Sequence, residues 1–355
     1  MKRLMPVILL AFIALTAVMT IIPGCDELVT QENSYYDTTI IRDSTCVAVC
    51  HSDVNTTMAV AVRQWENSRH ASGILTDTSI SGIEILFTKS CGPQCHNSQG
   101  FVQSLSSQPG STEYPLEIGC FTCHAPHTTW KLDSLRYYDP VTLADATTSF
   151  NRGKSNICAL CHQAITTPTA EIDDNFVNPD DSILVYPLWG PHGSQQADML
   201  LGTGGYEYGA TIGNSSHTNA SGSSCLKCHQ DITEGFTLGG HSLNMRDGND
   251  QLVAACNVFG CHSADNITDF SLYSGNDNLI YFQDSLILLA DTLNGFGILN
   301  TISYIKDPGL AGALYNYLFI TQDRSNGIHN LQYALGLIRE SLTYIDTATS
   351  LNPTP

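Results

Sequence analysis

Twelve of the thirteen cysteines of this chain stand in six pairs, and a histidine directly follows the second cysteine of every pair. Three pairs enclose two residues, two enclose three residues and one encloses four. The pairs are Cys46 and Cys50, Cys91 and Cys95, Cys120 and Cys123, Cys158 and Cys161, Cys225 and Cys228, and Cys256 and Cys261. A chain that repeats this arrangement six times must fold around whatever these sites bind.

Two thiols followed by histidine are the attachment signature of c-type haem. The thiols form thioethers with the porphyrin, and the histidine becomes the proximal ligand of the iron. Zinc sites also use Cys-x-x-Cys, and an exported chain can pair its cysteines in disulfides, but neither requires the following histidine. The sequence therefore predicts six covalently attached haems, including the three at wider gaps. Their proximal histidines, which number motifs one to six, are His51, His96, His124, His162, His229 and His262.

Six further histidines lie outside the motifs, which permits a second histidine ligand at every iron. The distal candidates are His70, His127, His192, His217, His241 and His329. His127 comes three residues after His124, too close to reach the opposite face of the same haem, so we expect it to bind the iron of a neighbouring haem. Methionine is the rival distal ligand and raises the reduction potential. Beyond the N-terminal segment only Met58, Met199 and Met245 are available.

The first residues have the character of an export signal. A basic end precedes an apolar run from Leu4 to Ile22, and Ile22-Pro23-Gly24-Cys25 resembles a bacterial lipoprotein cleavage box. We expect residues 1–24 to be the signal peptide and Cys25, the unpaired cysteine, to be lipidated. Pro23 departs from the usual box, so an uncleaved membrane span and secretion after cleavage elsewhere stay open. Each route exports the chain, in agreement with bacterial haem attachment outside the cytoplasm.

The chain is acidic, with a formal net charge of −19 at pH 7. Such a surface repels nucleic acid, and it is the ordinary charge of a soluble exported protein. We expect a membrane-anchored lipoprotein at the periplasm or cell surface of a Gram-negative-type bacterium. Its expected partners are other redox proteins: quinol-linked or periplasmic cytochromes, outer-surface cytochromes or acceptors. Contact with the membrane would run through the lipid anchor.

A possible calcium site is the acidic segment Asp247-Gly-Asn-Asp250. It lacks the twelve-residue loop with a terminal glutamate that typifies calcium-binding loops. Glycine, asparagine and aspartate are also the residues that favour tight turns. A turn is the preferred interpretation, and calcium is not excluded.

Composition divides the chain into three parts after the signal. Residues 25–45 are polar and predict a tether, residues 46–262 form one six-haem unit, and residues 263–355 form a helical segment that packs on it. Outside a few periodic stretches, Gly, Ser, Thr, Asn and Pro favour loops. The fold class expected is a multihaem cytochrome c with haems forming most of the core, mostly loops, a few α-helices and little β-structure. The predicted helices are Met58–Ser68, Ser285–Leu293 and His329–Ile345.

Three segments around the distal candidates resemble those of the multihaem c-type cytochromes of respiring bacteria, which reduce metals and nitrogen oxyanions. They are Trp65-x-x-x-x-His70, the run from Trp189-Gly-Pro-His192 to Met199, and the run from Asp323 through His329 to Ala334. The resemblance implies closely stacked or perpendicular haem pairs and electron transfer along the chain. It covers short stretches only.

The leading hypothesis is a membrane-anchored electron carrier in an anaerobic or extracellular respiratory pathway, which is not an enzyme. The first alternative is a haem reductase of a small nitrogen or sulfur oxyanion. In this reading one iron lacks a distal ligand, because His217 or His241 does not bind it. Pentahaem nitrite reductases carry Cys-x-x-Cys-Lys, which is absent here, since Lys227 lies inside motif five. The second alternative is a homopolymer, as a subunit of an extracellular cytochrome filament, although the motif gaps and the anchor do not obviously fit.

Overall fold

The computed structural model describes residues 56–72, 93–106, 116–129, 131, 133–176, 178, 180–186, 189–220, 224–231, 235–263, 267–270 and 277–351. The predicted signal peptide, Cys25, the tether and motif one lie outside these residues, as does Cys91. The chain forms two compact units, Met1–Val60 and Ala61–Pro355. All sites discussed below lie in the second unit. Of the helices described, none combines the length and apolar character needed to cross a bilayer.

In the described residues of the second unit before residue 264, most elements are short helices, joined by loops and a few two- or three-residue strands. The α-helices up to that point, with α2 beginning in the first unit, are α2 (Thr56–Glu66), α3 (Arg69–Ser72), α4 (Pro93–His96), α5 (Ser98–Leu105), α6 (Cys120–Cys123), α7 (Pro126–Thr129), α8 (Asn156–Ala159), α9 (Pro168–Glu171), α10 (Gln196–Leu201), α11 (Ser216–Asn219) and α12 (Cys225–His229). The 3-10 helices are η3 (Gly153–Ser155), η4 (Asp173–Asn175), η5 (Gly240–Ser242) and η6 (Val253–Ala255).

The described strands form three small antiparallel pairs. They are β1 (Val141–Thr142) with β2 (Ser149–Phe150), β3 (Ile183–Val185) with β6 (Ser303–Ile305), and β4 (Arg246–Asp247) with β5 (Asp250–Gln251). The β3–β6 pair joins distant parts of the chain, with Ile183 opposite Ile305 and Val185 opposite Ser303. In β4–β5, Asp247 faces Asp250 across a tight hairpin, so the turn expected there is confirmed.

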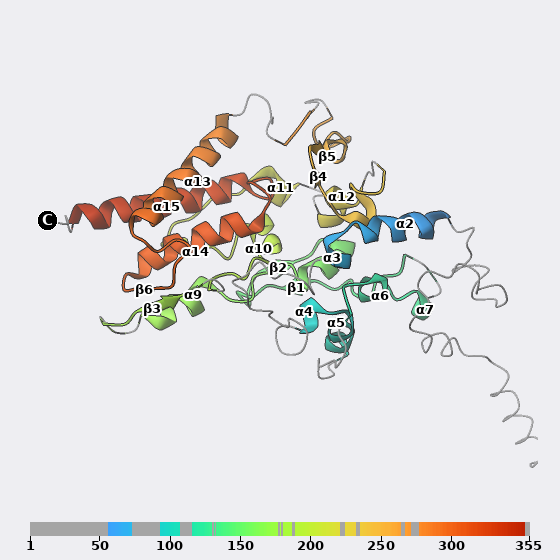
Figure 1. Cartoon of the computed structure of the whole chain (residues 1–355), viewed down its shortest axis with the longest axis horizontal. Helices are drawn as coiled ribbons and strands as arrows, with labels where there is room; N and C mark the ends of the chain where they lie inside the picture. Colours follow the sequence, from blue (N-terminus) through green and yellow to red (C-terminus); the bar gives the residue numbers. More distant parts are fainter. Residues whose placement is uncertain are drawn as a thin grey trace, which may run out of the picture. The chain divides into compact units, whose positions relative to one another are not determined.

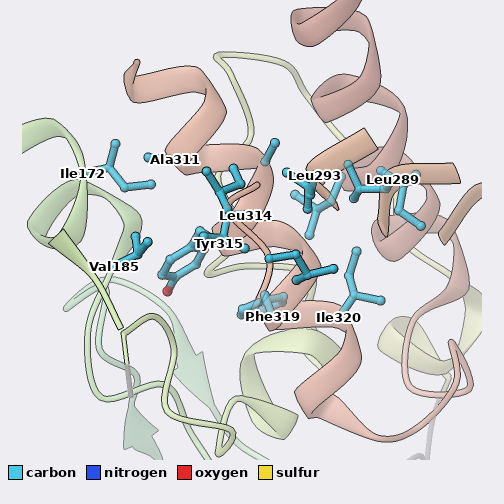
Figure 2. Close-up of a cluster of buried hydrophobic side chains, with 14 of the residues drawn as sticks. Ile172, Val185, Leu289, Leu293, Ala311, Leu314, Tyr315, Phe319 and Ile320 are labelled. Carbon is cyan, nitrogen blue, oxygen red and sulfur yellow. The ribbon is translucent and has the colours of Figure 1, made fainter. Parts of the chain in front are cut away.

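Three long helices follow residue 276 and pack against one another: α13 (Asp277–Gly295), α14 (Pro308–Asp323) and α15 (Leu331–Leu351) (Figure 1). Their buried side chains form the largest apolar cluster, which also takes in Ile172 and Val185 from before the helices. Figure 2 shows Tyr315 and Phe319 of α14 within this cluster. The expectation that haems form most of the core of residues 46–262 stays a prediction.

The three predicted helices are present with different bounds: α2 begins and ends two residues early, α13 is longer at both ends, and α15 begins two residues late and extends to Leu351. Helix α2 confirms the helix expected near Met58, and α13 confirms the one expected at 285–293 but is longer at both ends. Helix α15 begins at Leu331, after His329, because His329 belongs to the preceding loop.

The sequence interpretation missed α14, although its start carries a clear signal. The Asp307 carboxylate accepts a hydrogen bond of 2.7 Å from the Leu310 N–H, and Pro308 occupies the first turn, an arrangement typical of helix starts. Helix α14 is buried around most of its circumference. It therefore lacks the alternation of apolar and polar faces by which a helix is recognised in sequence.

Glycine in α14 allows close packing, and we expect Gly312→Ala to destabilise the protein by about 1–3 kcal/mol. A Cβ at this position would lie 2.3 Å from Cδ1 of Tyr206. The Tyr206 N–H is held by the side chain of Asn316 at 2.8 Å, which limits how far the ring can retreat. Urea unfolding of the mature protein, followed by circular dichroism, measures the change.

Gly295→Ala is the matched control, because nothing lies within 4 Å of a Cβ at this last residue of α13. Its free energy of unfolding should stay within about 0.5 kcal/mol of the native value. Equal stability of the two variants would contradict the close contact between α14 and Tyr206.

Candidate metal centres

The described Cys–Cys–His motifs fold as tight turns that bring the histidine back to the first cysteine, as motifs three and four show. In motif three the His124 N–H donates to the Cys120 carbonyl at 2.9 Å, and in motif four the His162 N–H donates to the Cys158 carbonyl at 2.8 Å. Residues three apart on such a turn lie on the same side. In these two motifs, both thiols and the histidine are therefore held together by local backbone hydrogen bonds.

Motif six closes in the same way despite its four-residue gap. The His262 N–H donates to the Cys256 carbonyl at 3.0 Å, which matches the bond in the shorter motifs. The additional residues form a turn in which the Cys261 N–H donates to the Val258 carbonyl at 3.1 Å. Gly260 adopts a φ of +85° in this turn, a conformation that favours glycine. The wide gap is thus accommodated without changing how the histidine meets the first cysteine.

Every motif histidine that the structure describes faces one histidine from outside the motifs. The ring-centroid distances are 5.9 Å for His96–His192, 6.0 Å for His124–His241, 6.1 Å for His70–His162, 6.4 Å for His229–His329 and 6.0 Å for His217–His262. Each of these five pairs joins one motif histidine to one distal candidate. The structure therefore selects a partner for each motif from the open list that the sequence provides.

This spacing suits a metal ion held between the two rings. A metal bound to an imidazole nitrogen at about 2 Å on each side, with about 1.1 Å from nitrogen to ring centroid, places the centroids about 6.2 Å apart. The observed distances of 5.9–6.4 Å bracket that value. Two imidazoles in direct van der Waals contact or in a hydrogen bond have no reason to repeat one spacing five times. The donor set and its geometry fit a haem iron with histidine on both sides.

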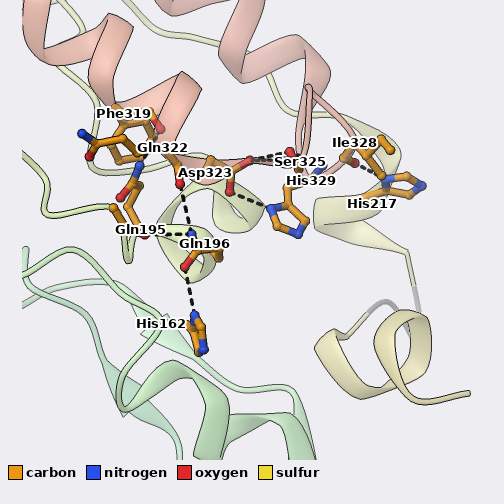
Figure 3. Close-up of polar contacts among 11 residues, drawn as sticks. His162, Gln195, Gln196, His217, Phe319, Gln322, Asp323, Ser325, Ile328 and His329 are labelled. Carbon is orange, nitrogen blue, oxygen red and sulfur yellow. Dashed lines mark hydrogen bonds and ion pairs between the residues drawn. The ribbon is translucent and has the colours of Figure 1, made fainter. Parts of the chain in front are cut away.

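Four of these rings have a described hydrogen-bond partner at Nδ1, which leaves Nε2 to face the opposite ring. The partners are Oε1 of Gln196 for His162 at 3.0 Å, the Leu243 carbonyl for His229 at 2.9 Å, the Ile328 carbonyl for His217 at 2.6 Å and Oδ1 of Asp323 for His329 at 2.7 Å. Such outer contacts fix the orientation and tautomer of a metal-binding histidine. Figure 3 shows three of them beside the end of α14.

Burial keeps most of the paired imidazoles neutral, as metal binding requires. It lowers the pKa of His70 to about 4, with a further contribution from His162. Burial also lowers the pKa of His96 and of His241. At His329 burial acts in the same direction, but the adjacent Asp323 carboxylate outweighs it and raises the pKa.

The sixth predicted centre is not formed by the described residues. The remaining motif histidine is His51, which lies outside them. The remaining distal candidate is His127, whose ring centroid lies 5.9 Å from that of Phe121. The expectation that His127 binds the iron of a neighbouring haem therefore stays a prediction.

Cysteines of different motifs lie against one another. Cys161 of motif four lies close enough to Cys95 of motif two for each thiol to shift the pKa of the other, and the same holds for Cys158 of motif four and Cys225 of motif five. The backbone agrees, because the Cys95 thiol lies 3.9 Å from the Leu160 carbonyl. The cysteines that the structure describes are free thiols. Motif four thus contacts motifs two and five, an order that differs from the sequence.

The loop between α14 and α15 supports two of the pairs at once. It holds His329, and its Ile328 carbonyl accepts the bond from His217. The buried Asn330 side chain closes the loop: its amide donates to Oδ1 of Asn214 at 2.6 Å and to the Thr218 hydroxyl at 3.0 Å, and its oxygen accepts from the Ser215 N–H at 2.8 Å. Sequence analysis singled out this segment but gave Asn330 no role, because its partners lie more than a hundred residues away.

Gln195 and Gln196 also had no predicted role, although they follow His192 in the run from Trp189 to Met199. Gln195 is buried and donates to the Phe319 carbonyl at 2.7 Å. Gln196 bonds to His162 and donates to the Gln322 carbonyl at 3.4 Å. The end of α14 therefore supports the motif-four histidine through an amide side chain (Figure 3).

The surroundings of the motifs also suit a large apolar group. Phe121 lies inside motif three, Phe259 inside motif six and Ile165 just after motif four, with 49%, 99% and 64% of their surface exposed. A covalently attached porphyrin removes such apolar surface from water.

Met199 is buried in the apolar core around α14, and Met245 packs on a small cluster at Leu238. Within the described ranges, no group of three or more histidine, cysteine or acidic side chains could hold a metal ion.

Asn330→Ala should lower the free energy of unfolding by about 2–4 kcal/mol, because it leaves several buried polar groups without partners. Asn219→Ala, at the exposed end of α11, is the control and should change stability by no more than about 0.5 kcal/mol. Chemical denaturation of both mature proteins provides the comparison. A loss at Asn330 no larger than at Asn219 would contradict its role in closing the loop.

Comparison of the chain with protein-family models, with curated proteins and with solved structures found no match. The chemistry of the candidate centres therefore follows from their own residues: five imidazole pairs at a common spacing, each with a histidine that directly follows a described cysteine.

Proposed function

We propose that this chain is a six-haem c-type cytochrome that transfers electrons, with histidine on both sides of each iron. The observation that carries the proposal is the set of five histidine pairs, whose ring centroids lie 5.9–6.4 Å apart. Each pair combines a histidine from a thiol-bearing motif with one from a distant segment. A fold without a metal between the rings gives no reason for this one-to-one matching.

When bound, each haem supplies an iron that accepts and releases one electron. The protein supplies the rest. Its motif cysteines hold the group covalently, and its paired histidines occupy both axial positions. Hydrogen bonds at Nδ1, such as that from His162 to Oε1 of Gln196, hold the rings in orientation. A centre closed on both sides has no position for a substrate, so we propose an electron carrier and not an enzyme.

Contacts between motifs support short steps for electrons. Cys161 lies near Cys95, and Cys158 lies near Cys225, close enough for each thiol to shift the pKa of the other. Because these thiols are the proposed attachment points, motifs two, four and five would hold their haems at neighbouring positions of the fold. Cys256 of motif six in turn lies close enough to Cys228 of motif five to affect its ionisation. These contacts support a route from motif two through four and five to six.

The reductase alternative needs one open iron, which the sequence located at His217 or His241. His217 faces His262 at 6.0 Å, and His241 faces His124 at 6.0 Å. The backbone N–H of His241 is further held by Oε1 of Gln64 at 3.0 Å. Both histidines therefore face a motif histidine, as distal ligands should. This supports electron transfer, because the reductase alternative requires that one of them does not bind iron.

The cellular setting is part of the same proposal. Export and a lipid at Cys25 would hold the protein at a membrane surface, where its net charge of −19 favours redox partners with a basic docking face. Intact-mass measurement of the mature protein should therefore show six haem additions together with a lipid. Fewer than six additions would contradict the haem assignment, and the absence of lipid would contradict only the anchor.

Removal of a distal histidine should open one centre without removing its haem. His241→Ala is expected to keep six haems, while one iron changes from low-spin to high-spin and binds carbon monoxide. Electron paramagnetic resonance and absorption spectra report this change. His241→Met should restore a low-spin iron at a higher reduction potential, because methionine also binds haem iron.

Met245→Leu is the matched control for the rival ligand. It preserves side-chain volume, and Met245 packs on the apolar cluster at Leu238. All irons should remain low-spin in this variant. A high-spin iron in Met245→Leu, or none in His241→Ala, would show that the pairing of His124 with His241 does not describe the centre.

A further inference from the structure

One ligand histidine differs from the others in the charge of its outer partner. Among the rings whose Nδ1 partner is described, His162, His217 and His229 bond to neutral oxygens of an amide or of the backbone. His329 instead bonds to the Asp323 carboxylate, with 2.7 Å between Nδ1 and Oδ1. Within this described set, only the motif-five centre has an acidic residue as its outer contact.

The position of Asp323 is fixed by its own environment. It is the last residue of α14, and only 4% of its surface is exposed. The Ser325 hydroxyl and N–H donate to its other oxygen, Oδ2, which leaves Oδ1 for His329. Within the described part of the chain, His329 is its ion-pair partner and no lysine or arginine bonds to it. The carboxylate is thus held against the ring in a region where little solvent screens its charge.

The end of α14 adds to this charge. The carbonyl end of a helix carries a partial negative charge, and here it lies next to Asp323 (Figure 3). A nearby negative charge favours the oxidised form of an iron, which carries one more positive charge than the reduced form. A carboxylate that accepts the Nδ1 proton also makes the ring a stronger electron donor at Nε2. Both effects act in the same direction.

We propose that Asp323, acting through His329, lowers the reduction potential of the haem bound by His229 and His329 below that of a centre whose rings contact neutral oxygens only. Asp323 is then a positioning and tuning residue of the motif-five centre. The inference rests on the proposed function, since it concerns a haem that the chain's own residues would hold.

The proposal places a haem of low reduction potential inside the electron route from motif two to motif six. Motif five contacts motif four through Cys225 and lies near motif six through Cys228. A centre of low potential at that position is among the last to be reduced and the first to give up its electron. Electrons that pass between motifs four and six would therefore cross motif five without accumulating there.

The test compares Asp323→Asn with Asp307→Asn in the mature holoprotein. Asparagine at 323 keeps an oxygen that can accept from Nδ1 but removes the charge. Asp307 lies at the other end of α14, where it caps the helix through Leu310, and asparagine caps a helix equally well. A redox titration followed by electron paramagnetic resonance resolves the individual low-spin irons.

In Asp323→Asn we expect the midpoint potential of one haem to rise, with about a tenfold change in its ratio of reduced to oxidised iron, or about 59 mV for a one-electron couple. The affected haem should be the one that His329→Met also shifts upward. Asp307→Asn should leave all midpoint potentials unchanged. Asp323→Glu keeps the charge, so the midpoint potential of the affected haem should lie close to its native value. All irons should remain low-spin in the aspartate variants.

Ser325→Ala is the second variant, in case Asp323→Asn does not mature. It removes a donor from the Asp323 carboxylate and so strengthens the bond to His329, which should lower the same midpoint. Unchanged midpoints in either variant with six haems retained would overturn the role of Asp323 but not the proposed function. A shift shared by all haems would also overturn it, because that is a general structural effect. A native protein without haem would overturn the proposed function itself.

Discussion

The arrangement of this protein depends on five pairs of imidazoles whose ring centroids lie 5.9–6.4 Å apart. Each described pair joins a motif to a segment elsewhere in the chain, as His70 joins to His162 and His229 joins to His329. With iron bound between the rings, as proposed, these pairs would become crosslinks between segments that are distant in the sequence. Folding and cofactor attachment are then coupled, because the free energy of ligation contributes to the stability of the folded state.

The C-terminal helices contribute most of the largest apolar core described, and two smaller clusters, around Phe150 and Leu252, lie among the motifs. Helix α14 lies at the centre of this core, and its last turn contacts the ligands of motif four through Gln196 and of motif five through Asp323. The loop that follows supports motif six through the Ile328 carbonyl. Three of the histidine pairs therefore have outer contacts at the end of α14 or in the loop that follows it. The charge at the end of α14 can tune one of them.

Parts of the fold and the site could be predicted because their causes are local. The motif turns close through hydrogen bonds between neighbours, such as His162 with Cys158, and α13 and α15 have apolar faces visible in the sequence. Helix α14 escaped prediction because burial on nearly all sides removes the periodic signal. Asn330 and Gln195 escaped because a buried amide is recognised by its partners, and those lie over a hundred residues away.

The sequence by itself determined the chemistry on offer: paired thiols, a histidine beside each pair and an equal number of histidines elsewhere. That information is local, since thioether attachment depends on residues a few positions apart. Only the tertiary structure decided which distant histidine faces which motif, that motif four touches motifs two and five, and that a carboxylate stands behind His329. These depend on how α14 and its neighbours pack, and packing brings together residues whose separation in the chain carries no record of it.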